Sequence, residues 1–139
     1  RKILENQLKI SDPKSKFVKM YDFVSQKKII EIMKNTDIYI FASSCETFGI
    51  TLLEGMAAGM VIASSNKSSI PEIIEDGGLL FDPENHFSIY ESIMLLVDNA
   101  DLREKLSKKA RKLASKYSWE KCSHETFTFI VESYLKYKN

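Results

Sequence analysis

The chain has 139 residues, the length of one domain. Of these residues 44% are hydrophobic and 28% are charged, which is the balance of an ordinary globular domain. Twenty Lys and Arg are offset by nineteen Asp and Glu, so the net charge of +1 gives no electrostatic argument for nucleic acid as a partner. Two cysteines are too few for a disulfide framework, and no signal peptide or transmembrane segment is recognisable, so a cytoplasmic location is expected.

The first part of the chain alternates short apolar runs with helical periodicity. Four elements are predicted in this order: strand 17–20, helix 29–34, strand 37–41 and strand 60–63. Gly77 and Gly78 then turn the chain into a further apolar run at 79–81. This alternation predicts an α/β fold with a Rossmann-like parallel sheet and flanking helices, formed by residues 1–139 as a single domain.

Only helical periodicity remains after Pro83. Apolar residues repeat at intervals of three and four over the segments 87–97, 102–113 and 127–134. Asp101 is expected to cap the second of these helices, with Glu104 as its capping-box partner. The Lys-rich stretches of these helices are interspersed with Glu, so they predict solvated faces.

Residues 46–56 lie where the predicted strand 37–41 meets a helix that begins near Gly49. In an open α/β sheet, ligands bind at the carboxyl ends of the strands, and the amides of a helix's first turn offer donors and positive charge to an anion. Seven residues separate Glu46 from Glu54, which lies roughly 7 Å along the helix axis. The two carboxylates are therefore predicted to bind different parts of one elongated ligand, with sugar hydroxyls at the acids and a phosphate between them.

This stretch resembles the Glu-x7-Glu signature of the large family of retaining glycosyltransferases with the GT-B fold. Six further segments match that family in order and spacing: 21–24, 35–37, 57–59, 71–74, 78–83 and 117–119. The resemblance covers roughly residues 17–120. It implies the carboxyl-terminal, donor-binding domain of a hexosyltransferase that retains the anomeric configuration.

The resemblance also implies the partners. The donor is expected to be a nucleotide-diphosphate sugar, linked to UDP or GDP. The acceptor is expected to be a carbohydrate or a lipid-linked molecule of surface-glycan or glycolipid biosynthesis, bound through an amino-terminal domain that this sequence lacks. Such an enzyme would be cytoplasmic or peripheral at the inner face of the membrane.

The roles of single residues follow from the same resemblance. Glu46 is expected to be the catalytic residue that binds sugar hydroxyls near the anomeric carbon, and Glu54 to hold the ribose hydroxyls. Gly49 and Ile50 would bind the diphosphate through their amides and Thr51 through its hydroxyl. A sixth residue, Phe48, is expected to be part of the core or a wall of the site.

Other reactive residues have ordinary interpretations. Cys45 adjoins the motif but has no histidine nearby in sequence, so packing is favoured over a nucleophile. His86 and His124 are expected to be structural or exposed. The sequence has no Asp-x-Asp and no cluster with metal-ligand spacing, so neither a metal nor another cofactor is expected.

Three features of the sequence depart from the family pattern. Val61 stands where a proline is usual, and Asp22 where many relatives have glycine. Ser68 and Ser69 replace a glycine pair, and serine resists some backbone conformations that glycine allows. Val61 and the serine pair keep open the alternative of a non-catalytic binding or assembly module. A second alternative is a relative of the epimerase or phosphorylase type, which shares the GT-B fold but reacts differently.

Two strands and a basic, glycine-rich phosphate-binding segment that the resemblance implies are missing from the sequence. In the strand order 3-2-1-4-5-6 the missing strands would lie between 17–20 and 37–41, leaving a gap of about 14 Å. Either the sequence is an excerpt, or the strand at 17–20 pairs elsewhere, or another copy fills the gap. We expect an excerpt of a two-domain enzyme, with Arg1 inside a helix, and little or no transfer by the excerpt alone.

Overall fold

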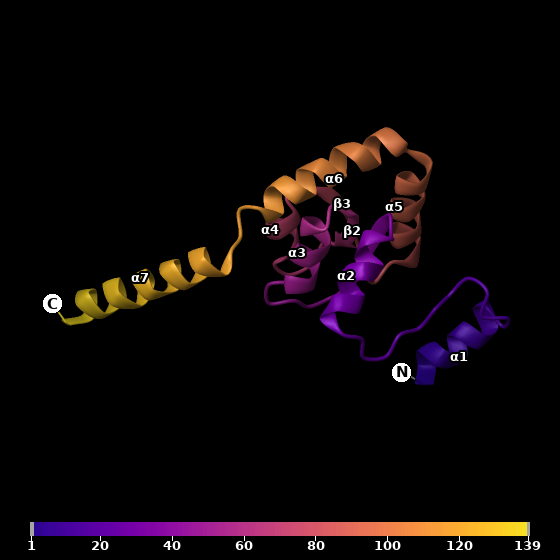
Figure 1. Ribbon diagram of the computed structural model, residues 1–139, viewed down its shortest axis with the longest axis horizontal. Coiled ribbons are helices and arrows are strands. Elements are labelled where there is room, and N and C mark those ends of the chain that lie inside the picture. The colour runs from indigo at the N-terminus through magenta and orange to yellow at the C-terminus, as the bar shows by residue number, and fades with distance from the viewer. Residues whose placement is uncertain (1, 139) are drawn as a thin grey trace.

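The computed structural model describes residues 2–138, and Figure 1 shows their arrangement. The elements along the chain are α1 (Lys2–Ser11), α2 (Gln26–Lys34), β1 (Ile38–Phe41), α3 (Ile50–Ala57), β2 (Val61–Ser65), α4 (Ile70–Ile74), β3 (Gly78–Phe81), α5 (His86–Asp98), α6 (Ala100–Ala114) and α7 (Trp119–Lys138).

The three strands form one parallel sheet in the order β1-β2-β3. Tyr39 of β1 lies opposite Ile62 of β2, which lies opposite Gly78 of β3. Every residue of β2 is buried, as expected for the central strand of a parallel sheet with both faces covered. The α/β fold and the strands predicted at 37–41 and 60–63 are confirmed.

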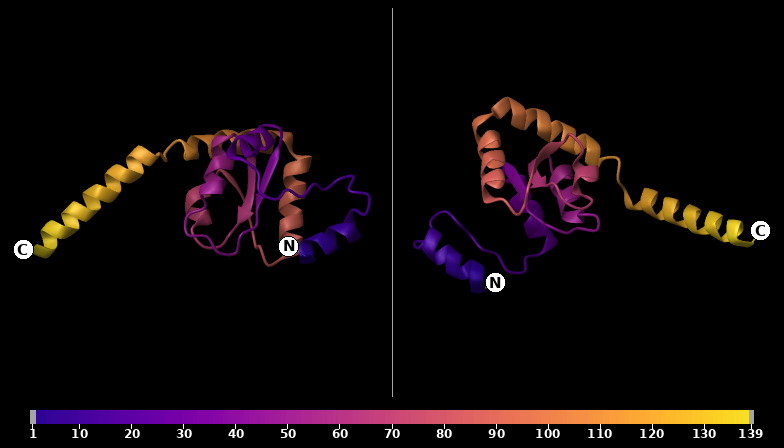
Figure 2. Two further views of the ribbon diagram at one scale, coloured as in Figure 1. Left: turned by 60° about the horizontal axis from the view of Figure 1, so that its bottom comes forward. Right: turned by 180° about the vertical axis from the view of Figure 1, so that it is seen from behind.

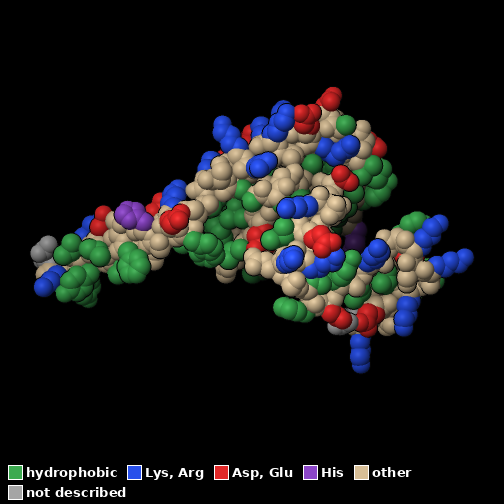
Figure 3. Space-filling model, in the orientation of Figure 1, with side chains coloured by type: hydrophobic (Ala, Val, Ile, Leu, Met, Phe, Trp, Pro, Cys, Tyr) green, Lys and Arg blue, Asp and Glu red, His purple; other side chains and the backbone are tan. Residues whose placement is uncertain are grey.

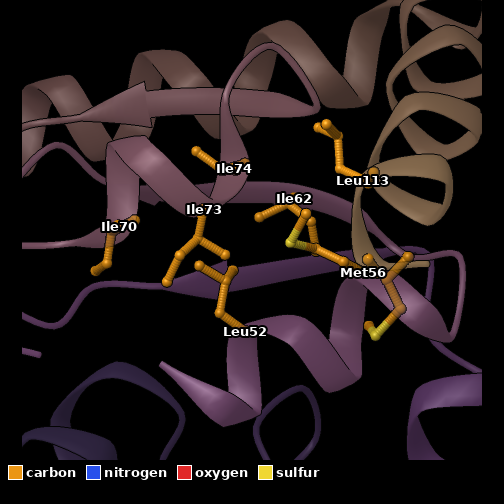
Figure 4. Packing of buried hydrophobic residues seen from close by; sticks show 10 residues of the cluster. Leu52, Met56, Ile62, Ile70, Ile73, Ile74 and Leu113 are labelled. Atoms are coloured by element: carbon orange, nitrogen blue, oxygen red, sulfur yellow. The ribbon is translucent and has the colours of Figure 1, made fainter. Parts of the chain in front are cut away.

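Helices cover both faces of the sheet because successive side chains of β2 point to opposite sides. On one face, Ile62 packs against Leu52 and Met56 of α3 and against the apolar residues of α4, as Figure 4 shows. On the other face, Val61 and Ala63 pack with Leu96 of α5. The two clusters are the hydrophobic core of the described chain.

Helix α6 crosses the amino ends of the strands. The Ser107 hydroxyl donates a hydrogen bond of 2.6 Å to the carbonyl oxygen of Gly59, two residues before β2. At Gly77, just before β3, a Cβ atom would lie 3.0 Å from the Cα atom of Ala110 and 2.8 Å from Leu113. The amino edge of the sheet is therefore occupied by protein.

Helix α7 stands apart from this body in each view of Figures 1 and 2, and α1 stands apart from it in Figure 1. Neither helix has a buried residue, and α7 exposes large apolar side chains that Figure 3 shows as green atoms. Lys and Arg side chains gather along the outer side of α6, as predicted for a solvated face. No helix within residues 2–138 has the length and apolar character needed to cross a membrane.

Residues 17–20 do not form a strand, and that prediction is wrong. The carboxylate of Asp12, at the end of α1, accepts hydrogen bonds from the N–H groups of Lys16, Phe17 and Val18 at 2.9, 2.7 and 2.8 Å. The amides that a sheet partner would need are thus bound to a side chain. The segment is an exposed loop despite its apolar sequence, with Phe17 80% exposed.

The expected cap of α6 is also wrong. Asn99, not Asp101, is the N-cap, and its side-chain oxygen accepts a hydrogen bond of 2.9 Å from the N–H of Leu102. Because α6 begins at Ala100, Asp101 lies inside the first turn, where its charge favours the helix dipole. Glu104 pairs with Lys108 at 2.5 Å instead of closing a capping box.

Acid should release the loop that follows α1. The bond from Val18, followed by those from Lys16 and Phe17, holds the pKa of Asp12 below its ordinary value of 3.8. Because its pKa is lowered on folding, ionised Asp12 stabilises the folded loop at pH values above 3.8. This stabilisation is lost as the pH falls through the pKa of Asp12 in the folded protein. Amide hydrogen exchange measured by NMR should show these three N–H groups losing protection below pH 3.8, and Asp12→Asn should lower their protection at neutral pH. Unchanged protection in Asp12→Asn would contradict this prediction.

Candidate functional site

The carboxyl ends of the three strands open onto loops at one edge of the sheet. These loops comprise residues 42–49 after β1, 66–69 after β2 and 82–85 after β3. Three side-chain contacts join them: Ser44 Oγ to Glu84 Oε1 at 2.5 Å, Lys67 Nζ to Asp82 Oδ1 at 3.5 Å, and Ser69 Oγ to the carbonyl oxygen of Glu46 at 3.3 Å. The edge opposite α6 is thus built from three mutually attached loops.

Helix α3 begins at this edge with its first amides available. Its N-cap, Gly49, has φ +85°, a left-handed conformation that glycine adopts without a Cβ clash, and no side chain caps the helix. The amides of Leu52 and Leu53 bind the carbonyl oxygen of Gly49 at 3.0 and 3.2 Å. The amides of Ile50 and Thr51 have no partner within residues 2–138. Two N–H groups and the positive end of the helix dipole therefore face outward, which suits an anion.

The two acids of the motif both lie near the half-buried phenol of Tyr39. Tyr39 projects from β1 towards α3, and burial raises its pKa above the ordinary value of 10.0. A hydrogen bond with the Thr51 hydroxyl opposes this shift, and the negative charges of Glu54 and Glu46 add to it. Both carboxylates, each half-buried, are therefore close enough to influence one hydroxyl group. The structure brings together Glu46, Thr51 and Glu54 around Tyr39.

A largely apolar cavity of about 480 Å³ adjoins the same helix. Its walls include Phe48, Ile50 and Glu54 on one side and Tyr117 and Trp119 on the other. The ring of Phe48 is 40% exposed and meets that of Tyr117 edge to face, with 5.7 Å between centroids. Phe48 is thus a wall and not part of the core. Glu46, Gly49 and Thr51 do not line this cavity.

Sequence reasoning missed Tyr39 and Ser69 as neighbours of the site. Tyr39 stands in an apolar run that reads as an ordinary strand. Only the alternation of side chains between the two faces of β1 could have indicated that Tyr39 lies on the face covered by α3. The hydrogen bond from Ser69 to Glu46 joins residues 23 positions apart, which no local pattern encodes.

The histidines and cysteines have the following places: Cys45 precedes Glu46 directly, and Cys122 lines the same cavity as Glu54. His86 is the first residue of α5, His124 is exposed on α7, and both cysteines are exposed and free. Within residues 2–138 no three His, Cys, Asp or Glu side chains gather as metal ligands would.

The replacement of a glycine pair has a visible backbone consequence. Ser68 has φ +56°, in the left-handed region, whereas Ser69 has φ −76° in the right-handed region. Ser68 therefore holds a conformation that glycine would hold with less strain. Ser69 adopts an ordinary conformation and uses its hydroxyl to hold Glu46.

The chain is similar in sequence to known glycosyltransferases. Residues 7–113 match the family described as glycosyl transferases group 1. O-antigen chain mannosyltransferase B of Escherichia coli is 32% identical over 88 residues, covering 63% of this chain and 23% of that protein. The chain spans less than a third of the length of the curated relatives it matches.

Two solved structures share the fold at low sequence identity. Sucrose-phosphate synthase from Thermosynechococcus elongatus is 16% identical with a TM-score of 0.85, over 97% of this chain and 34% of that one. Anabaena Alr3699/HepE, solved in complex with UDP, is 20% identical with a TM-score of 0.80, over 95% of this chain and 36% of that one. These likenesses show that the chain has the architecture of part of a GT-B enzyme.

Two neighbouring serines should respond in opposite directions to the same substitution. Ser68→Gly relieves a left-handed conformation and should raise the free energy of unfolding by up to about 1 kcal/mol. Ser69→Gly removes the hydrogen bond to Glu46 and adds backbone freedom, and should lower it by about 1 kcal/mol. Urea denaturation of both variants and the wild type measures these differences. Destabilisation of similar size in both would contradict the assignment of strain to Ser68.

Proposed function

The chain belongs to the glycosyl transferases group 1 family, and from this we propose that it binds a nucleotide-diphosphate sugar at the amino end of α3 and supports retaining transfer of the sugar. One observation carries the proposal: the amides of Ile50 and Thr51, which have no partner within residues 2–138, stand in the sequence between Glu46 and Glu54, and both of these carboxylates influence Tyr39. A nucleotide-diphosphate sugar has the matching order of groups, with hydroxyls at both ends and two phosphates between them.

Each part of the ligand meets a suitable group in this arrangement. Glu54, in the second turn of α3, accepts hydrogen bonds from the ribose hydroxyls. The amides of Gly49 and Ile50 and the amide and hydroxyl of Thr51 bind the diphosphate. Glu46, in the loop before the helix, accepts hydrogen bonds from the sugar hydroxyls. A carboxylate suits such a diol because its two oxygens can accept from both hydroxyls.

The site would assist the reaction by stabilising the diphosphate leaving group. As the bond between the sugar and the diphosphate breaks, negative charge develops on the diphosphate oxygens. The outward amides and the dipole of α3 are fixed before the reaction, so they stabilise that charge without reorganising. Glu46 orients the sugar near its anomeric carbon, beside the cationic character that develops there.

The partners and product are inferred from relatives. Alr3699/HepE was solved in complex with UDP, and this supports a donor in which the sugar is linked to UDP or GDP. The E. coli mannosyltransferase acts on O-antigen chains by its name, which supports a carbohydrate or lipid-linked acceptor in surface-glycan synthesis. The acceptor would bind through a further domain. Product analysis of the longer protein with a labelled donor distinguishes retaining transfer from epimerisation and from a non-catalytic module.

Neutralising Glu54 should weaken nucleotide binding. Glu54→Gln removes charge-assisted hydrogen bonds worth about 1.5 to 3 kcal/mol each, so the Kd should rise roughly ten- to a hundredfold. Calorimetric titration of the 139-residue chain with UDP, GDP and ADP measures this change and identifies the preferred base. Glu91→Gln, on the exposed side of α5, is the matched control and should bind as the wild type does. Equal affinity in wild type and Glu54→Gln would remove Glu54 from the site.

Truncating Glu46 should affect the sugar more than the nucleotide. Glu46→Ala should raise the Kd of the intact nucleotide sugar roughly tenfold while changing that of the free nucleoside diphosphate little, because one carboxylate contact to the sugar is lost. Calorimetric titrations of one preparation of the variant with the nucleotide sugar and with the free nucleoside diphosphate measure the two changes in Kd. A loss of the same size for both ligands would show that Glu46 touches no sugar.

A further inference from the structure

Glu46 is bound by a hydrogen bond from a loop that is distant in the sequence. It lies in the irregular segment 42–49, between two exposed residues, Cys45 and Thr47. The hydroxyl of Ser69 donates a hydrogen bond of 3.3 Å to the carbonyl oxygen of Glu46. Within residues 2–138 Glu46 makes no other hydrogen bond. Ser69 therefore helps to place the backbone from which the Glu46 carboxylate extends.

The hydroxyl of Ser69 is used for this contact and not for its own helix. Ser69 is the N-cap of α4, and a serine at that position usually accepts a hydrogen bond from an amide of the first turn. Here no side-chain hydrogen bond caps α4, and Ser69 has φ −76° and ψ −8°. Pro71, in the first turn, has no N–H group to offer a cap. Within residues 2–138 the one hydrogen bond of this hydroxyl joins two loops.

The loop that carries Ser69 is itself attached to the sheet. The N–H of Asn66 donates a hydrogen bond of 2.8 Å to the carbonyl oxygen of Phe81, at the end of β3. The N–H of the following residue donates one of 3.1 Å to the hydroxyl of Ser65, a fully buried residue of β2. On the other side of Ser69, Ile70 is fully buried in the core. Ser69 is thus held between a turn bonded to two strands and a core residue.

We propose that Ser69 is a positioning residue of the donor site and orients Glu46 towards the sugar of the nucleotide sugar. This inference rests on the proposed function, because it takes Glu46 to bind the sugar hydroxyls. Hydrogen bonds weaken steeply when their distance and angle are wrong, so a carboxylate that binds a diol has to be placed accurately. Ser69 supplies part of that placement without touching the ligand.

Ser69→Ala removes the hydroxyl and keeps the Glu46 carboxylate. The Kd of the nucleotide sugar should rise roughly threefold, as for the loss of one neutral hydrogen bond, and by less than for Glu46→Ala. The Kd of free UDP or GDP should stay as in the wild type, because Glu46 does not bind the nucleotide. Calorimetric titration of the 139-residue chain measures both values.

Two further variants control for the substitution itself. Ser68→Ala removes a neighbouring hydroxyl that makes no hydrogen bond within residues 2–138, and it should bind the nucleotide sugar as the wild type does. Ser69→Thr retains a hydroxyl and should bind the nucleotide sugar more tightly than Ser69→Ala. Equal loss in Ser69→Thr and Ser69→Ala would overturn the assignment to the hydroxyl.

A double-mutant cycle distinguishes positioning from a general effect on the fold. In the Glu46→Ala background, Ser69→Ala should leave the Kd of the nucleotide sugar unchanged, because the carboxylate through which Ser69 acts is absent. A further threefold loss in that background, or an equal loss of affinity for free UDP or GDP, would overturn the positioning role.

The outcomes also separate this inference from the function on which it rests. If the wild type binds no nucleotide sugar, both are overturned. If Glu46→Ala weakens sugar binding but Ser69→Ala binds as the wild type does, the role of Ser69 alone is overturned. If Ser69→Ala fails to fold, Ser69→Cys takes its place, because a thiol is a weaker donor, and the same comparison of the two ligands decides.

Discussion

The contact between the ring of Tyr39 and the backbone of α3 at Gly55 determines the geometry of the site. An added Cβ at Gly55 would approach that ring to 2.8 Å, so the helix can lie this close to β1 only with glycine there. The close approach of α3 to β1 sets the distance between the helix and the sheet, and with it the position of the amino end of the helix. The outward amides of Ile50 and Thr51 and the carboxylate of Glu54 all belong to α3. Their positions relative to Glu46, which follows β1, therefore depend on this contact together with the packing of Leu52 and Met56 on the sheet.

The two edges of the sheet have different roles. Helix α6 covers the amino edge, where Ser107 bonds to Gly59, and leaves the carboxyl edge to loops. Loops tolerate polar residues because their backbone is exposed, whereas the strands between the edges must be apolar. The carboxyl-edge loops are held to one another by contacts such as Ser69 to Glu46. A site there combines exposed polar groups with a rigid support, which is what orienting a charged leaving group requires.

The predictions that failed concern segments in which a polar side chain binds backbone amides, so that hydrophobic periodicity does not determine the local structure. Residues 17–20 are apolar enough for a strand, but the Asp12 carboxylate binds the amides of Phe17 and Val18. The N-cap of α6 moved from Asp101 to Asn99 because α5 and α6 are separated by that single residue. In both cases a side chain bonded to nearby backbone amides changed the local structure, and hydrophobic periodicity carries no information about such bonds.

The amino-acid sequence by itself determined the parallel α/β fold, the start of α3 at Gly49 and the family, because these depend on periodicity, on a left-handed glycine and on motif spacing. The sequence also named Glu46 and Glu54 as candidates. Only the tertiary structure decided that both acids lie near one phenol, that Phe48 faces a cavity shared with Tyr117, and that Ser69 holds Glu46. Those relations join residues far apart in the chain, and they exist only once β1, α3 and the loop after β2 are packed together.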